Sequence, residues 1–169
     1  LLNVGNIVDM TDINRIAPDA VLYVWQGGMT GGKGTADVLT GKVSPSGKLP
    51  DTIAYKASDY PSDANFGREE NRDIYAEDIY VGYRYFETFA KEKVLYPFGF
   101  GLSYTEFEIK TEKAEITEGA VKLSVSVKNV GSYKGKEVIE VYCEAPQGRL
   151  GKAARVLCGF EKTRELAPQ

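Results

Sequence analysis

VKLSVSV, residues 121–127, alternates apolar and polar side chains at every position. A period of two places the apolar side chains on one face, which is typical of an antiparallel strand with one buried side. The stretch EVIEVY at residues 137–142 alternates less strictly, and Gly131 and Gly135 supply a turn between the two runs. The pattern therefore predicts two half-buried β-strands separated by this turn.

Two further strand signals flank this pair. Phe107 and Ile109 predict a first strand, and VLCGF at residues 156–160 predicts part of another. Short strands separated by turn residues fit a β-sandwich of immunoglobulin-like architecture. Because the chain reaches Gln169 before two full sheets have appeared, we expect the sandwich to be incomplete.

The first 53 residues carry a different pattern. LLNV at residues 1–4 and VLYVW at residues 21–25 are apolar without alternation, as expected for strands that are covered on both faces. A glycine-rich turn, GGMTGG, follows the second run at residues 27–32. We interpret it as a tight turn in which backbone approaches backbone, because its spacing does not match a phosphate-binding loop.

Two short helices are expected around these strands. The first is expected to be capped by Asp9 or Thr11 and to end before Pro18. The second is expected over residues 33–40, with Gly41 at its C-terminal end. The order strand, helix, strand, glycine-rich turn, helix predicts a parallel sheet.

The middle of the chain, residues 54–104, shows few regular features. A segment of this length without regular structure is usually functional or packs against another domain. An apolar strand is expected directly after Glu77 and Asp78.

Ten aromatic residues gather in this part of the chain: Tyr75, Tyr80, Tyr83, Tyr85, Phe86, Phe89, Tyr96, Phe98, Phe100 and Tyr104. Such side chains suit packing between domains or against sugar rings, and we assign most of them to packing.

Composition excludes several classes of function. The chain contains no histidine, which excludes Ser-His-Asp and Cys-His mechanisms and His-ligated metal sites within it. Any acid–base chemistry would use Asp, Glu, Tyr or Lys. The net charge of -3 gives no basis for a nucleic-acid partner, and no apolar run approaches the ~20 residues of a membrane span. We therefore expect no metal, no cofactor, no nucleic acid and no membrane partner.

Two cysteines, Cys143 and Cys158, lie in apolar runs that resemble strands. We expect both to be small buried apolar side chains. A disulfide between them requires adjacent strands, which the sequence does not establish.

Five segments together resemble family 3 glycoside hydrolases, in the order in which that family carries them. They are NVGNIVDM at residues 3–10, GGKGTADVL with GKVSPSGKLP at residues 31–50, YAEDIYVGYRY at residues 75–85, YPFGFGLSYT at residues 96–105, and VKNVG with GKEV at residues 127–138. Leu157 and Phe160 are similar to a further strand of the family's fibronectin-like domain. Met29 and Thr30 depart from the family pattern, so this loop is expected to shape substrate preference differently.

The resemblance implies two domains. Residues 1–104 are similar to the C-terminal part of an α/β-sandwich domain with an aromatic linker loop. Residues 105–169 are similar to a truncated fibronectin type III-like domain. The fold class implied is a remnant of an α/β sandwich with a parallel sheet, followed by an immunoglobulin-like or fibronectin III-like β-sandwich.

The resemblance also implies an activity. Members of the family are retaining exo-acting glycosidases, of β-glucosidase or β-xylosidase type, that hydrolyse terminal non-reducing β-linked sugars. Their Asp nucleophile lies on a barrel domain, and their acid/base Glu lies upstream of the segment that matches residues 1–10. We therefore expect no catalytic residue in this chain, an inactive fragment, and the missing barrel domain and a glycoside as its partners.

Five residues are candidates for contact with sugar in the full enzyme: Trp25, Gln26, Tyr75, Glu77 and Asp78. Trp25 and Gln26 follow the carboxyl end of a strand, where sites form in parallel sheets. The alternative for Trp25 is burial under the glycine-rich loop. The alternative for Glu77 and Asp78 is a helix cap or an ion pair with Arg84.

Two other functions fit the sequence. The chain is alternatively a non-catalytic carbohydrate-binding module, or a purely structural β-sandwich spacer. The sequence does not name the sugar. A bacterial cytoplasmic and a secreted location both fit, because a signal segment would lie upstream of Leu1.

Overall fold

The computed structural model describes residues 1–169 and divides the chain into two compact units. Unit 1 contains Leu1–Gly32, Lys48–Phe100 and Glu140–Gly159, and unit 2 contains Lys33–Gly47, Gly101–Ile139 and Phe160–Gln169. Each unit is therefore assembled from three stretches that are distant in sequence. The predicted division at residues 104 and 105 stays a prediction.

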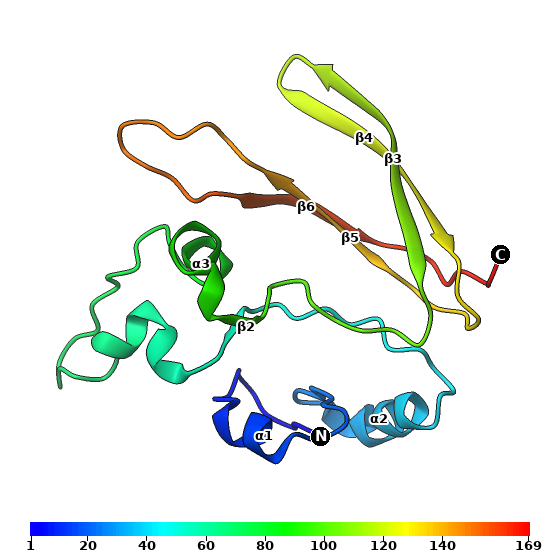
Figure 1. The fold of residues 1–169 in the computed structure, drawn as a ribbon, viewed down its shortest axis with the longest axis horizontal. Coiled ribbons are helices and arrows are strands. Elements are labelled where there is room, and N and C mark those ends of the chain that lie inside the picture. The colour runs from blue at the N-terminus through cyan, green and yellow to red at the C-terminus, as the bar shows by residue number, and fades with distance from the viewer. The chain divides into compact units, whose positions relative to one another are not determined.

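Regular structure is short in the first half of the chain and longer in the second (Figure 1). The helices are α1 (Thr11–Ile16), α2 (Gly31–Leu39) and α3 (Tyr83–Phe89), with 3-10 turns η1 (Gly28–Thr30), η2 (Ala57–Asp59), η3 (Pro61–Ala64) and η4 (Lys91–Lys93). The strands are β1 (Ile53–Ala54), β2 (Val94–Tyr96), β3 (Phe107–Thr117), β4 (Ala120–Asn129), β5 (Val138–Cys143) and β6 (Val156–Lys162). They form three two-stranded sheets, β1–β2, β3–β4 and β5–β6.

The two N-terminal apolar runs pair in the predicted parallel direction, but only as one isolated bridge between Leu2 and Tyr23. The Leu2 N–H donates to Leu22 O at 2.8 Å, and the Val24 N–H donates to Leu2 O at 2.8 Å. The parallel pairing is thus confirmed, although neither run forms a full strand.

Helix α1 forms and ends at Ile16 as predicted, but Met10 occupies its N-cap position and no side chain caps it, so the predicted capping by Asp9 or Thr11 is wrong. Asp9 Oδ1 accepts the Thr11 N–H at 2.8 Å, and its Oδ2 accepts the Ala57 N–H at 3.0 Å. The Thr11 side chain and these two backbone N–H groups hold the pKa of Asp9 below its ordinary value of 3.8, because they stabilise the carboxylate. Asp9 therefore links the start of α1 to the segment around Ala57.

The core of unit 1 lies where α3 meets the β1–β2 sheet. Ala54, Phe86 and Ala90 are almost fully buried, and the ring of Tyr60 meets the edge of Phe86 with centroids 5.4 Å apart. The Tyr60 hydroxyl accepts the Ala54 N–H and donates to Thr52 O, both at 2.9 Å. Burial raises the pKa of Tyr60.

The apolar strand expected after Glu77 and Asp78 is wrong, because this stretch continues into helix α3. Gly82, with φ 58°, occupies the N-cap position immediately before the helix. Phe86 and Ala90 are four residues apart, so one turn of helix brings both onto the buried face. The spacing of the aromatic residues in this stretch fits a helix as well as a strand. The burial of Phe86 in the core of unit 1 favours the helix.

The second half of the chain forms the strands that the sequence predicts, but the turn at Gly131–Gly135 does not pair the strands on either side of it. β4 pairs antiparallel with β3 from Phe107↔Asn129 to Thr117↔Ala120, with an irregularity between Thr111 and Lys113. Gly119, with φ 83°, makes the turn between them. The turn predicted around Gly131 therefore separates two sheets and does not join paired strands.

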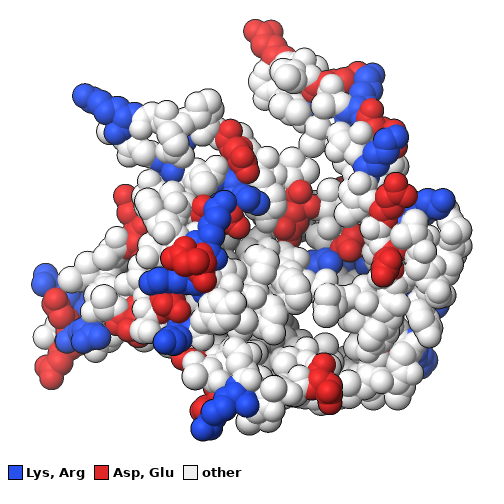
Figure 2. Space-filling view, in the orientation of Figure 1, with Lys and Arg blue, Asp and Glu red and all other residues white.

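The polar face of the β3–β4 hairpin is covered by lysine–glutamate pairs. Lys110 lies 3.3 Å from Glu112, and Lys113 pairs with Glu115. Figure 2 shows basic and acidic atoms side by side along this hairpin. Exposed pairs of this kind contribute little stability.

Asn129 is the buried polar centre of unit 2, with 1% of its surface exposed. Its Oδ1 accepts from Thr105 Oγ1 at 2.7 Å and from the Gly131 N–H at 3.1 Å. Its Nδ2 donates to Tyr133 O at 2.7 Å and to Leu166 O at 2.9 Å. One side chain thus joins the start of β3, the segment after β4 and the C-terminal stretch.

Both cysteines are exposed and free, so their predicted burial is wrong and no disulfide joins them. Cys143 is the last residue of β5, and Cys158 lies on its partner strand β6. A two-stranded sheet leaves much of its surface uncovered, so an apolar run in it does not guarantee burial.

No helix of the structure is both long enough and apolar enough to cross a membrane.

Replacing Asn129 by alanine is expected to lower the free energy of unfolding by about 2–4 kcal/mol, because four partners lose their hydrogen bonds to this buried side chain. Urea unfolding followed by circular dichroism measures the loss. Asn71→Ala, at an exposed position, is the matched control and is expected to change stability by less than about 0.5 kcal/mol. Equal losses in the two variants would contradict this role for Asn129.

The Asp9 carboxylate is expected to make stability depend on acid pH. Because its pKa is lowered in the folded chain, its contribution is present above the unfolded value and is lost as pH falls through the folded value. Melting temperatures of Asp9→Asn and the parent chain should therefore differ at pH 7 and converge towards pH 2. A constant gap across this range, or the same convergence in the exposed control Asp73→Asn, would refute the assignment.

Candidate functional site

All five residues predicted to contact sugar lie in unit 1. Trp25 and Gln26 follow the parallel bridge at Tyr23, whereas Tyr75, Glu77 and Asp78 lie in the segment before α3. The two groups come from separate stretches of the chain, and their local geometry differs.

Trp25 adopts a left-handed backbone conformation, with φ 56°. This region is strained for a bulky side chain and costs on the order of 1–3 kcal/mol, so its presence marks a position that the surroundings hold in place. The indole ring is half-buried and packs on Tyr23, with ring centroids 5.0 Å apart and planes tilted by 39°. Its remaining surface is open, as an aromatic sugar platform requires.

Tight backbone contacts follow Trp25. A β-carbon at Gly27 would lie 2.6 Å from the Gly31 Cα, which confirms that backbone approaches backbone in this turn. The side chain of Gln26 lies over the chain at Gly5, where a β-carbon would lie 3.0 Å from Gln26 Nε2. Met29, where the sequence departs from the family pattern, is fully exposed in the same turn.

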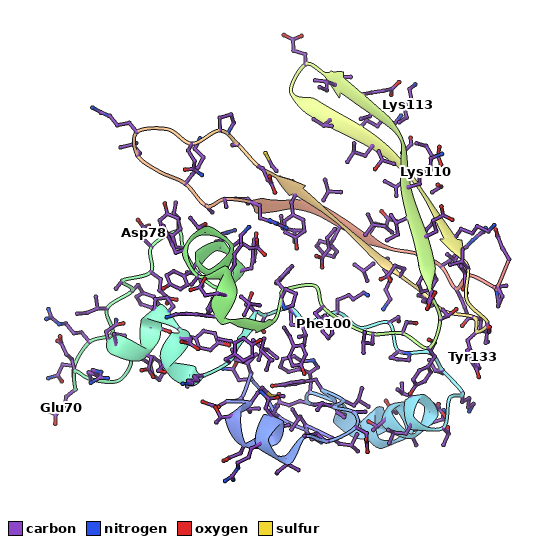
Figure 3. The ribbon with its side chains drawn as sticks, in the orientation of Figure 1. Glu70, Asp78, Phe100, Lys110, Lys113 and Tyr133 are labelled. Atoms are coloured by element: carbon purple, nitrogen blue, oxygen red, sulfur yellow. The ribbon has the colours of Figure 1, made fainter.

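The second group forms an exposed turn. Tyr75 exposes 91% of its surface, Glu77 is half-buried, and its carbonyl accepts the Tyr80 N–H at 2.9 Å. Asp78 has φ 52°, a left-handed conformation that Asp tolerates better than bulky residues. Figure 3 shows Asp78 beside the beginning of α3.

The ion pair considered for Arg84 does not form. Neither Glu77 nor Asp78 pairs with it, and the Arg84 guanidinium lies over the ring of Tyr83, 5.8 Å from the centroid. Its Nε is buried without a hydrogen-bond partner. The carboxylates of the turn are therefore free to interact with another group.

The structure does not join the two groups of predicted residues. No hydrogen bond, ion pair or ring contact connects Trp25 or Gln26 to the turn at residues 75–78. No set of three or more Cys, Asp or Glu side chains could hold a metal ion. The two groups are separate surfaces of unit 1, and their contact with sugar stays a prediction.

Sequence reasoning missed a polar cluster between α3 and the β5–β6 strands. Arg155 pairs with Glu87 of α3 at 3.1 Å, and its guanidinium lies over Tyr142, 5.7 Å from the centroid. Tyr142 donates to Glu140 Oε2 at 2.6 Å, and burial, followed by this contact, raises the pKa of Tyr142. The only sequence signal is that residues 140 and 142, two apart on a strand, share one face.

Comparison with known proteins identifies the family. Residues 1–104 match the glycosyl hydrolase family 3 C-terminal domain, and the chain belongs to this family, as the sequence motifs predict. The chain is 67% identical to a β-glucosidase of Ruminococcus albus over 168 residues, which are 99% of this chain and 18% of that protein.

Solved structures of two relatives agree in fold. A β-glucosidase from Paenibacillus barengoltzii is 56% identical, with a TM-score of 0.92 over 98% of this chain and 19% of its own. β-Glucosidase 3B from Thermotoga neapolitana, solved in complex with glucose, is 41% identical, with a TM-score of 0.87 over 99% of this chain and 24% of its own. The chain thus spans about a fifth of the length of the relatives it matches.

The left-handed backbone at Asp78 predicts an unusual order of substitutions. Asp78→Gly is expected to be more stable than Asp78→Ala by about 1 kcal/mol, because glycine alone adopts a positive φ without a β-carbon clash. Denaturant unfolding of both variants measures the difference. The same pair at Asp73, whose φ is not positive, is the control and should give glycine no advantage. An alanine variant at position 78 as stable as the glycine variant would argue against this conformation.

Proposed function

We propose that the chain is a fragment of a β-glucosidase that removes terminal non-reducing β-linked glucose. The observation that carries the proposal is the 67% identity to the Ruminococcus albus β-glucosidase across 99% of the chain. β-Xylosides are a second substrate class to test, because the residues that discriminate between sugars are expected mainly on the barrel.

The proposed reaction proceeds with retention of configuration. Such enzymes hold two carboxyl groups ~5 Å apart on either side of the glycosidic bond, one acting as nucleophile and the other as acid and then base. Glu77 and Asp78 are neighbours in one exposed turn, so they do not face each other across a bound sugar. Both catalytic carboxylates are therefore assigned to parts of the enzyme outside this chain.

The chain's own role in this proposal is to support and border the site. Trp25 offers a half-open indole face, and Tyr75 an almost fully exposed ring. Gln26, Glu77 and Asp78 supply polar groups for sugar hydroxyls. Exposed Phe89 fits burial against a further domain of the same protein.

We also propose how the two parts of the chain fit into the domains of the full protein. Residues 1–104 are proposed to complete an α/β sandwich in the full protein, with the Leu2–Tyr23 bridge as part of its parallel sheet. Residues 105–169 are proposed to begin a fibronectin III-like β-sandwich, with β3–β4 and β5–β6 contributing to its sheets. The exposed apolar side chains Ile116 and Val121 on one face of the β3–β4 hairpin support this, since a sandwich buries that face.

A non-catalytic carbohydrate-binding module is the alternative, and the exposure of Tyr75 favours it. Affinity electrophoresis of the 169-residue chain in β-glucan separates the two functions. Saturable retardation that Tyr75→Ala abolishes and Tyr133→Ala preserves would favour the binding module, since both tyrosines are exposed but lie in different units.

Enzymatic activity is tested on the full-length protein that carries this chain. It is expected to hydrolyse an aryl β-glucoside and to release β-glucose first, as observed by NMR, while leaving the α-glucoside intact. The 169-residue chain alone is expected to show no turnover. Failure of the full-length protein on β-glucosides and β-xylosides would overturn the activity, and turnover by the chain alone would overturn the assignment of the catalytic residues.

A further inference from the structure

The loop between β5 and β6 is long and internally ordered. It runs from residue 144 to residue 155, whereas loops between adjacent paired strands usually have 2–5 residues. The Gln147 side chain holds it closed: Nε2 donates to Lys152 O, and Oε1 accepts the Lys152 N–H, both at 3.1 Å. The Gly151 N–H also donates to Gly148 O at 3.1 Å. These hydrogen bonds therefore preorganise the tip of the loop in the unbound chain.

The base of this loop is fixed to α3. The Ala154 N–H donates to Thr88 Oγ1 at 2.9 Å, and Ala153 is buried, with 5% of its surface exposed. Arg155 pairs with Glu87 of the same helix. A rigid base and a closed tip lower the entropy lost on binding, which is the main advantage of a preorganised contact loop.

The tip carries an apolar side chain between two cations. Leu150 exposes 91% of its surface, and Arg149 forms neither an ion pair nor a hydrogen bond. The ammonium group of Lys152 also has no ion pair. Figure 2 shows basic atoms at the outer end of this loop. An exposed apolar anchor beside an arginine is the composition found in binding hot spots.

The complementary surface is on the same chain. The acidic loop, residues 63–78, contains six carboxylates and two arginines and exposes 79% of Phe66. Glu70 and Asp73 in it form no ion pair. Glu70 lies at the outer end of this loop (Figure 3). Because Leu150 and Phe66 are both largely exposed, the two loops do not cover each other within one chain.

From this complementarity we infer that the chain binds a second copy of itself, with Arg149 and Leu150 of each copy packed on Phe66 and Glu70 of the other. Both loops belong to unit 1, and Figure 1 shows them projecting towards the same side of the view. A two-fold axis therefore forms the contact twice. Since only loop tips meet, the interface is small and the dimer reversible, with association that weakens as salt rises. The inference does not depend on the proposed activity.

Sedimentation velocity of the 169-residue chain over a concentration series tests the dimer. The parent chain is expected to dimerise, with weaker association in 0.5 M NaCl. Leu150→Ser and Arg149→Glu are expected to raise the dimer Kd by about tenfold or more. Ile116→Ser is the matched control for Leu150, because it removes an equally exposed apolar side chain (86%) far from the loop in sequence. Arg164→Glu is the control for Arg149.

A charge exchange identifies the contact itself. Arg149→Glu alone and Glu70→Arg alone place like charges in both contacts of a homodimer, so each variant should stay monomeric. Mixing the two variants restores opposite charges at both contacts and should restore the dimer. A monomeric parent chain, association that the Ile116→Ser control weakens as much as Leu150→Ser does, or a mixture that stays monomeric would each overturn the inference. Circular dichroism of every variant verifies that loss of the dimer is not loss of the fold.

Discussion

Unit 2 depends on one buried amide. Asn129 uses both acceptor sites of its oxygen and both donors of its nitrogen, and its partners come from three different stretches of chain. Aspartate has no donors for Tyr133 O and Leu166 O, and glutamine is longer by one methylene group. Asparagine is therefore the residue type that this arrangement of partners requires at position 129. In a unit with few fully buried apolar side chains, this satisfied network defines where the strands begin and end.

The periodic part of the sequence predicts local structure well and pairing less well. Alternation over residues 121–127 marks β4 correctly, because a two-residue period is a local property. Which strand pairs with β4 depends on the turn at Gly119 and on contacts between distant residues, so β3 and not β5 is its partner. The helix at residues 83–89 was missed for a related reason: an aromatic run fits both periods, and the burial of Phe86 decides between them.

The candidate site is predicted only in outline. The sequence identifies the family through motif order, and it places Trp25 at the end of an apolar run, where the backbone proves to be strained. Sequence alone did not reveal that Asp78 shares this conformation, because φ depends on the turn that the whole segment adopts. The cluster around Arg155 and Glu87 was missed because its members are 68 positions apart and meet only after α3 packs on the strands. Residues that complete a sugar site are expected elsewhere in the full protein, so no pattern within this chain could show them.

The turn between β3 and β4 has a consequence for how such chains diverge. A β-carbon at Gly119 would meet no other atom within 4 Å, and the flanking Glu118 and Ala120 are exposed. Insertions and deletions are tolerated where the backbone is exposed and makes few contacts. The tip of this hairpin is therefore a natural place for length variation during evolution, and an epitope tag or a fluorophore attached there would leave the amide network at its base intact.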